Sequence, residues 1–378
     1  MVASSLAVKH YFRKLKDPRI NRNKLHLLLD IVVITLCAVI AGCQDWQQIV
    51  TFAHARHDWL KRFLRLPNGI PSHDTFERVF DCLDPQQFQA CFRAWIQALH
   101  RALGLSQIAI DGKTLRGSGL GGFAPLHLVS AWATANGLSL GQVAVAADSN
   151  EIPAIPKLLE LLDVQGALVT IDAMGCQKEI AAKVIAGGGD YVLTVKDNQP
   201  SLLADIQNCF VQAVERDFAG LRYDHYETEE RGHGRQERRS YEILIDPPPF
   251  ASQGEWAGLR VIGMCYCECV RDGKTTSELR YFIGSRVAKA KVYGSALRNH
   301  WRIENNLHWQ LDVAFGEDDN RVSRRHGAEN LALVRRLALS LLQQHPDRRS
   351  VACKRLLAAL DPTFLLEVLQ GGGDPGKI

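Results

Sequence analysis

The chain has 378 residues, enough for two or three domains at about 150 residues each. Hydrophobic residues make up 46% and charged residues 23%, which is the composition of an ordinary globular protein and not of a disordered chain. The net charge of +4 is too small to indicate a nucleic-acid partner by itself, so the distribution of charge matters more than its sum.

Basic residues gather in three places along the chain. Between residues 9 and 24 there are seven Lys or Arg against one acid, Asp17. Further basic clusters fall at residues 231–239 and 321–325. Each cluster alone could be a solvated face. Together, and alongside the acidic residues described below, they favour a surface that binds phosphate groups.

The first hundred residues are predicted to be helical. The expected helices cover residues 25–42, 46–55, 59–64, 72–82 and 85–103, with Ser72 as a helix cap and a turn at Pro67-Asn68-Gly69. Short helices around a tight turn permit a DNA-binding module, and a plain helical cap on a catalytic domain is the alternative. The uncharged run at 31–43 is 13 residues long, short of the ~20 needed to span a bilayer, so we expect a buried core helix.

From about residue 107 the pattern changes to alternating strands and helices. Strands are expected at 107–111, 126–134, 140–146, 167–172 and 191–195, with Asn136-Gly137 as a hairpin turn. Helices are expected at 153–162, capped by Ser149-Asn150, and at 177–186. Three strands in a meander, then a helix, a strand, a helix and a strand, is the order of a ribonuclease H-like domain.

A mostly β segment is expected next, after a helix at 201–214. Its strands are predicted at 222–229, 237–245, 260–270 and 279–283. Cys265, Cys267 and Cys269 alternate, so they share one face of a strand, and this spacing favours packing over zinc binding. The ten cysteines form no pair of Cys-x-x-Cys motifs, and no signal peptide is evident, so we expect reduced thiols in a cytoplasm.

Helices return at 295–313 and 328–344. In the second helix, apolar residues at helical spacing are expected to pack in the core, and we assign them no catalytic or binding role (Leu331, Val334, Leu337, Leu341). In the first helix, Glu304 and four other residues are spaced three or four positions apart, so we expect them to share one face of the helix (Leu297, Trp301, Glu304, His308, Leu311). An unpaired carboxylate on such a face would cost several kcal/mol unless a cation or a donor meets it.

Two aspartates end strand-like runs in the same way. Asp111 follows Ile108-Ala109-Ile110, and Asp172 follows Val169-Thr170-Ile171. Carboxylates that meet at strand ends can bind hard divalent cations, and a metal shared with Glu304 would remove the desolvation cost of that residue. The alternative for Glu304 is a salt bridge to Arg298 or Arg302. Nearby acids compete for its role (Asp312, Glu317, Asp318).

The segment from Ala109 to Ser118 resembles the first catalytic block of DDE-type insertion-sequence transposases, in the subgroup called H-repeat-associated proteins. Other blocks agree in order and spacing: Pro71 to Phe76, Asp172 to Gln177, Val195 to Gln199, His233-Gly234-Arg235, His300 to Asn305 with Leu307 to Val313, and Asn330-Leu331-Ala332 with Arg335-Arg336. The resemblance spans nearly the whole chain, and the order of the blocks makes it specific.

The resemblance implies an α/β fold in which a ribonuclease H-like catalytic core carries a β-rich insertion and an N-terminal helical domain. The expected boundaries are an N-terminal helical, DNA-binding domain at 1–104, the first part of the core at 105–200, the insertion at 201–290, core helices with the third acid at 291–345, and a tail at 346–378. The matching acids are Asp111, Asp172 and Glu304. They are expected to be catalytic and to ligate two Mg²⁺ ions, for which Mn²⁺ can substitute.

The implied reaction is metal-dependent hydrolysis of the phosphodiester at transposon ends, followed by strand transfer into target DNA, with no covalent protein intermediate. The residues expected to contact DNA lie past the strand ends, in the insertion and near the third acid (Lys113, Arg116, Lys196, Asn198, His233, Arg235, Arg298, His300). The expected partners are double-stranded DNA, both terminal inverted repeats and target, and other copies of the chain on DNA. We expect no membrane partner and a cytoplasmic location associated with the bacterial nucleoid. The alternatives are a ribonuclease H-like DNA nuclease and an inactive or domesticated DNA-binding remnant.

Overall fold

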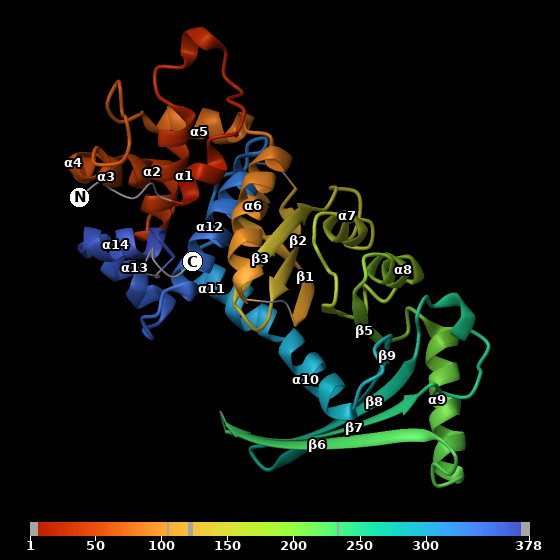
Figure 1. The fold of residues 1–378 in the computed structure, drawn as a ribbon. Helices are drawn as coiled ribbons and strands as arrows, with labels where there is room; N and C mark the ends of the chain where they lie inside the picture. Colours follow the sequence, from red (N-terminus) through yellow and green to blue (C-terminus); the bar gives the residue numbers. More distant parts are fainter. Residues whose placement is uncertain (1–6, 104–105, 120–123, 233, 372–378) are drawn as a thin grey trace. The chain divides into compact units, whose positions relative to one another are not determined.

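The computed structural model describes residues 7–103, 106–119, 124–232 and 234–371 of the chain (Figure 1). Contacts divide the chain into two compact units. The first unit consists of residues 1–104, 112–149 and 304–378, and the second of residues 105–111 and 150–303. Strand β1 (Gln107–Leu115) contributes its early residues to the second unit and its late residues to the first.

The first unit is mostly helical. Two helices, α2 (Leu28–Ile40) and α12 (Gly327–Gln344), pack against each other and are buried on almost every side. Helix α2 is apolar on nearly all sides and is stable only inside a core, whereas α12 also buries polar side chains, among them Arg335 and Arg336. The buried core helix expected at 31–43 is therefore confirmed, and among the described residues no helix is long and apolar enough to cross a membrane.

Other helices and a hairpin surround this pair. The hairpin joins β2 (Leu126–Ala133) to β3 (Leu138–Ala144) in antiparallel register, through the expected turn at Gly137, whose φ of 63° suits glycine. The strand order in this unit is β3-β2-β1. The remaining helices of the unit are α1 (Ala7–Phe12), α3 (Trp46–Ala55), α4 (His57–Leu60), α5 (His73–Cys82), α6 (Pro85–Leu103), α11 (Trp309–Val313), α13 (Val351–Leu360) and α14 (Pro362–Leu369).

The second unit is built on a mixed sheet. Its strand order is β1-β4-β5-β9-β8-β7-β6, formed by β4 (Leu168–Ile171), β5 (Asp190–Val195), β6 (Arg222–Gly232), β7 (Arg235–Ile245), β8 (Val261–Arg271) and β9 (Lys274–Gly284). Strands β1, β4 and β5 run parallel, and β9 pairs antiparallel with β5. The β segment expected as an insertion therefore extends the sheet of this unit, because its last strand hydrogen-bonds to β5.

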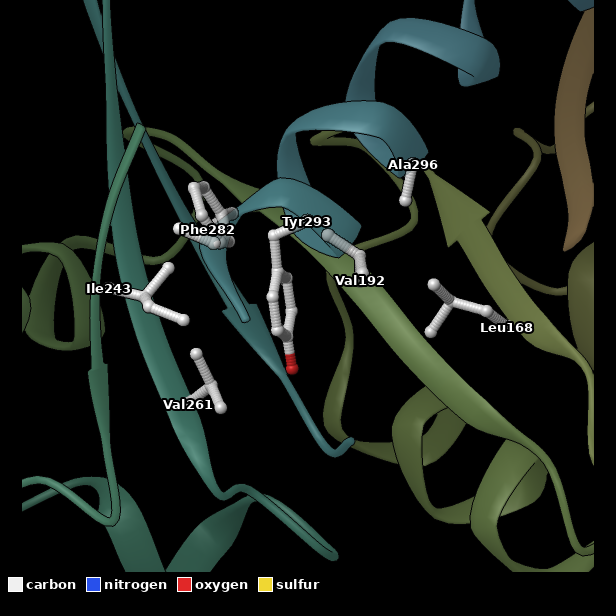
Figure 2. Close-up of a cluster of buried hydrophobic side chains, with 8 residues drawn as sticks. Leu168, Val192, Ile243, Val261, Phe282, Tyr293 and Ala296 are labelled. Carbon is white, nitrogen blue, oxygen red and sulfur yellow. The ribbon is translucent and has the colours of Figure 1, made fainter. Parts of the chain in front are cut away.

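The four helices of the second unit are α7 (Ala154–Glu160), α8 (Lys178–Ala186), α9 (Pro200–Glu215) and α10 (Ala290–His300). Helix α10 packs on the sheet through a buried cluster formed with β4, β5, β7, β8 and β9 (Figure 2). The Tyr293 ring stacks on Phe282 with centroids 5.6 Å apart. Phe282 in turn covers its cross-strand partner Gly263, where an added Cβ would come within 2.1 Å of the ring. Glycine is required there because the aromatic ring occupies the space of a side chain.

Two expected helix caps differ from the structure. Ser72 does precede α5, but its side chain makes no capping hydrogen bond, and its hydroxyl lies 3.1 Å from that of Thr75. Helix α7 is preceded by Pro153, so the expected cap at Ser149-Asn150 is wrong. The Asn150 side chain instead accepts a hydrogen bond from the Ile152 amide, which closes a turn before the helix begins.

Candidate active site

Two carboxylates lie at the same edge of the sheet in the second unit. Strands β1 and β4 are adjacent and parallel, with Ile110 opposite Ile171, so the residues that follow, Asp111 and Asp172, are neighbours at the carboxyl ends of both strands. Both are half-buried. The Asp172 carboxylate accepts hydrogen bonds from the backbone amides of Met174 (3.1 Å) and Gly175 (3.4 Å), which fix the turn after β4. The sequence prediction that these two acids converge agrees with this geometry.

A buried histidine accompanies the two acids. His300, at the end of α10, is 7% exposed and places Nδ1 3.1 Å from the Thr170 hydroxyl. Burial is the largest influence on the imidazole and lowers the pKa of His300, although Asp111 and Asp172 act to raise it. The side chain is therefore neutral at pH 7. His300 is among the residues expected to contact DNA, and with 7% of its surface exposed it offers little area to a ligand.

Buried polar side chains form a hydrogen-bonded network that includes His300. The Gln107 amide nitrogen donates to the Thr170 hydroxyl (3.2 Å) and to the Ala296 carbonyl (2.8 Å). Gln107 and Thr170 are 7% and 1% exposed. This network ties β1, β4 and α10 together. Buried polar groups of this kind rigidify a site when they are satisfied.

A hollow of about 730 Å³ opens beside Asp172 and His300 within the second unit. Its walls come from one face of β7, β8 and β9, where alternate residues point the same way, and from the end of α10. Basic side chains line it (Lys196, Arg235, Arg239, Arg280, Arg298), and so do the three alternating thiols (Cys265, Cys267, Cys269). Burial raises the pKa of Cys265 to about 11, so its thiol is uncharged at neutral pH.

Glutamates offset most of the arginines in this hollow. Arg298 pairs with Glu230 (2.7 Å), Arg280 with Glu278 (2.7 Å), and Arg235 with Glu237 (3.2 Å). These pairs hold the guanidinium groups in place. Exposed ion pairs contribute little stability, so an incoming phosphate can compete for such arginines at small cost.

Arg280 and Trp301 are among the residues of the hollow that the sequence prediction missed. Arg280 lies opposite Cys265 in the register of β8 and β9, and Trp301 follows α10 with 42% of its surface exposed. The Arg280 guanidinium carbon lies 5.8 Å from the centroid of the Trp301 ring. The alternation of residues 278, 280 and 282 along β9 was the signal that could have placed Arg280 on this face.

Other predicted contact residues are dispersed. Lys196 and Asn198 are exposed after β5, and Asn198 donates to the Ala173 carbonyl (2.8 Å), which braces the turn after Asp172. His233 lies outside the described residues. In the first unit Arg116 is exposed, with Asp318 3.7 Å away, whereas Lys113 is buried against Asp312 and Asp318. Since both of these carboxylates already hold Lys113, it is not free to contact phosphate.

Glu304 has surroundings different from those expected. The segment predicted as a helix at 295–313 is helical but not regular: α10 ends at His300, a π-helix covers Glu304–His308, and α11 follows. A π-helical turn adds a residue and shifts the direction of the side chains that follow. Trp301 and Glu304 are therefore exposed while His308 and Leu311 are buried, so the single shared face does not form. The Gln343 side chain donates to the Asn306 carbonyl (2.9 Å) in this segment.

The competing acids are engaged in the first unit. Asp312 and Asp318 hold Lys113, and Glu317 forms a fully buried ion pair with Arg336 (3.0 Å). Gly117, in the same region, approaches the backbone of residues 318 and 320 so closely that an added Cβ would lie 2.4 Å from the Asn320 carbonyl oxygen. The Gly-Ser that ends the first motif block thus packs against this loop. Each of the three acids already has a cationic partner in this unit.

The arrangement provides oxygen ligands for a hard cation, but only from two side chains at this edge. In the part of the chain that the structure describes, no group of three or more His, Cys, Asp or Glu side chains is arranged to hold a metal ion. Asp111 and Asp172 fit a divalent ion such as Mg²⁺ by donor type and by their adjacent register. Glu304 belongs to the other unit.

Comparisons with known proteins agree with the sequence motifs. Residues 9–96 match a family model described as DDE_Tnp_1-associated, and residues 103–341 match one described as Transposase DDE domain. The second match covers more than half of the chain. The chain belongs to the DDE transposase family.

Relatives within the family support the same assignment. "Putative transposase YncI" of Escherichia coli O157:H7 is 40% identical over 375 residues, covering 97% of this chain and 95% of the relative. "H repeat-associated putative transposase YhhI" of Escherichia coli strain K12 is 38% identical over 357 residues, covering 92% and 93%. The resemblance to H-repeat-associated transposases is thereby confirmed.

A solved structure also aligns with this one. It is a piggyBac transposase synaptic complex with hairpin DNA, 11% identical, with a TM-score of 0.37, covering 98% of this chain and 83% of that chain. A likeness of this size does not establish a shared fold.

Proposed function

We propose that this transposase-family protein cuts phosphodiester bonds at transposon ends with divalent metal ions and joins the freed 3′ ends to target DNA. The observation that carries the proposal is the placement of Asp111 and Asp172 side by side at the ends of two parallel strands. Paired carboxylates beside a basic hollow provide both a cation site and a place for the phosphates of the substrate.

The ribonuclease H-like core predicted from the sequence is part of this proposal. The strand order around β1 supports it. The order is β3-β2-β1 in the first unit, and β1, β4 and β5 are adjacent and parallel in the second. In open sheets with parallel strands, ligands bind beyond the carboxyl ends of the strands. Asp111 and Asp172 occupy that position.

Asp111 and Asp172 would hold Mg²⁺, or Mn²⁺ in its place, and Glu304 is proposed as the third acid because of its sequence motif. Bound ions would supply Lewis-acid activation of water and stabilisation of the leaving 3′ oxygen. Backbone amides after β4 orient the Asp172 carboxylate, and the buried His300 lies near enough to both acids to feel their charge. No serine or tyrosine nucleophile is required.

The substrate would be positioned by charge. Lys196, Arg235 and Arg298 line the hollow next to Asp172, and Asn198 and Arg116 are exposed beyond their strand ends. Contacts of this type fix the register of DNA without reading its sequence. Pairing of two transposon ends would require more than one copy of the chain on DNA.

The proposal is tested with the DNA that flanks the gene as substrate, with purified protein and Mg²⁺ or Mn²⁺. Wild type should nick the ends and join them to a plasmid, whereas Asp172→Asn and Glu304→Gln should do neither. Asp163→Asn is a matched control, because this exposed aspartate precedes β4 at the opposite end of the strand. It should leave both reactions intact.

The other outcomes each select a different function. Cutting without joining would establish a DNA nuclease. Binding without cutting would leave an inactive or domesticated DNA-binding protein. Activity that survives in Asp172→Asn would show that the site has been wrongly assigned.

A further inference from the structure

A second hollow, of about 970 Å³, lies within the first unit and contains none of the proposed acids. Three separate parts of the chain line it: the segment 18–26, the start and exposed side of α5, and residues 324 and 325. Five arginines contribute (Arg19, Arg22, Arg78, Arg324, Arg325). Two of the three basic clusters seen in the sequence thus meet in one place, although about 300 residues separate them.

The charges in this hollow are poorly compensated. Among the described residues, Arg22, Arg324 and Arg325 form no ion pair, and Arg78 donates only to the backbone carbonyl of Asp74 (3.1 Å). Arg19 pairs with Asp17 at 2.8 Å. Like charges gathered this closely repel one another, and a bound polyanion relieves that repulsion.

Buried polar atoms at the same place lack partners. Within the described residues, Nη1 of Arg19 and Nδ1 of His26 are buried without a hydrogen bond, and so is Oδ1 of Asp81. Nη1 of Arg19 is a donor, and an unpaired buried donor is costly unless a ligand completes its bonding; the Asp81 oxygen is an acceptor and is not a partner for phosphate. Arg19 already uses its other nitrogens on Asp17 and the His26 carbonyl, which fixes Nη1 in place.

Helix α5 adds to the positive potential. It begins at this hollow, with Ser72 and Thr75 in the lining, and its N-terminal amides carry the partial positive charge of the helix. The opposing charge is Asp81, 8% exposed. Burial, followed by Glu77, raises the pKa of Asp81, while Arg324, Arg325 and His326 lower it.

We propose that this hollow binds the phosphates of a duplex DNA backbone, independently of base sequence and apart from the candidate acids. Guanidinium groups suit phosphate oxygens because their planar donors match the geometry of the anion. The identity of the polymer as DNA rests on the proposed function, whereas the charge and hydrogen-bond argument does not.

The test measures binding of a fluorescent random-sequence duplex by anisotropy, in EDTA, over a series of salt concentrations. Arg324→Ala with Arg325→Ala should lower the slope of log affinity against log salt by about 2, at one phosphate contact each. Affinity should fall roughly tenfold or more at low salt. Replacing both with lysine should retain most of the slope, since charge is kept.

A control pair is available in the same unit. Lys61 and Arg62 are exposed and do not line the hollow, so Lys61→Ala with Arg62→Ala removes the same charge elsewhere. That variant should bind as wild type does. Asp81→Asn should change the affinity for the duplex in the opposite direction, because loss of the acid should strengthen binding. Thermal unfolding of each variant checks that the fold is intact.

Every outcome decides the proposal. Equal loss of slope in the control pair, or no loss in the arginine pair, would overturn it while leaving the proposed function standing. Weakening confined to a duplex carrying the transposon end would overturn sequence independence. Displacement of the duplex by a few millimolar inorganic phosphate would show a site for the free anion instead. Absence of DNA binding in wild type would overturn this proposal and the proposed function together.

Discussion

The imidazole Nδ1 of His300 lies 3.1 Å from the hydroxyl oxygen of Thr170. That hydroxyl accepts a hydrogen bond from Gln107 and lies 3.4 Å from the Ile108 carbonyl. The role of Nδ1 follows from the imidazole tautomer: as an N–H it donates to this hydroxyl, which then donates to the Ile108 carbonyl, and as a bare nitrogen it accepts from the hydroxyl. The histidine is thereby held in one orientation beside Asp111 and Asp172.

His300→Ala should slow end cleavage about 10–100-fold, the usual effect of removing a group that orients metal-binding side chains. The loss should appear in the single-turnover rate and in Mn²⁺ affinity. DNA affinity should not change, because the residue is buried. His300→Asn, which retains a hydrogen-bonding atom near the position of Nδ1, should recover part of the rate. Loss of DNA binding in His300→Ala would instead support the direct DNA contact first predicted from the sequence.

Thr170→Val should lower the free energy of unfolding by about 1–3 kcal/mol, because it leaves buried polar partners without their shared hydroxyl. Urea denaturation measures the change. The double variant Gln107→Leu, Thr170→Val should cost less than the sum of the two single variants, since an apolar pair leaves fewer groups unsatisfied. Additive losses would show that the two side chains do not act as one network.

Glu317→Gln should destabilise the protein by about 3–5 kcal/mol, since it leaves the Arg336 charge buried without its partner. Both side chains are fully buried. Replacing both partners with apolar residues, as in Glu317→Leu with Arg336→Met, should recover much of that loss. Denaturant midpoints of the wild type and the two variants provide the comparison, and equal midpoints for the single and the double variant would contradict the expectation.

Glu329 should make stability depend on pH. Burial, followed by the Asp84 charge, raises the pKa of Glu329 to about 7 from 4.5. Between these values the unfolded chain loses a proton that the folded chain keeps, so stability falls as pH rises from 4.5 to 7. Glu329→Gln should therefore be more stable than wild type at pH 8, by on the order of 3 kcal/mol, and should match it near pH 4. Thermal unfolding across this range tests the sign, and a variant less stable at pH 8 would refute it.

Much of the local structure could be predicted from the sequence. The buried helix at 31–43, the hairpin turn at Gly137 and the four strands between 222 and 284 follow from apolar runs, turn residues and alternation. The adjacency of Asp111 and Asp172 was also predictable, because each ends a short buried run that forms a strand of the same sheet. These features depend on residues close together in the chain.

The break in the helix around Glu304 could not be predicted in this way. A regular period of 3.6 residues continues through Trp301, Glu304 and His308, yet the chain adopts a π-helix there. The Asn306 carbonyl in this segment bonds to Gln343, 37 residues away, and no local pattern reveals such a partner.

The sequence by itself determined the family, the class of secondary structure in most segments, and the acids and basic clusters available for chemistry. Only the tertiary structure decided which of those charges are already used. It placed Lys113 between two aspartates, buried His300 beside the acids, and brought Arg22 and Arg325 to one hollow. The reason is physical: propensity and periodicity act over a few residues, whereas burial and ion pairing depend on which distant segments pack together.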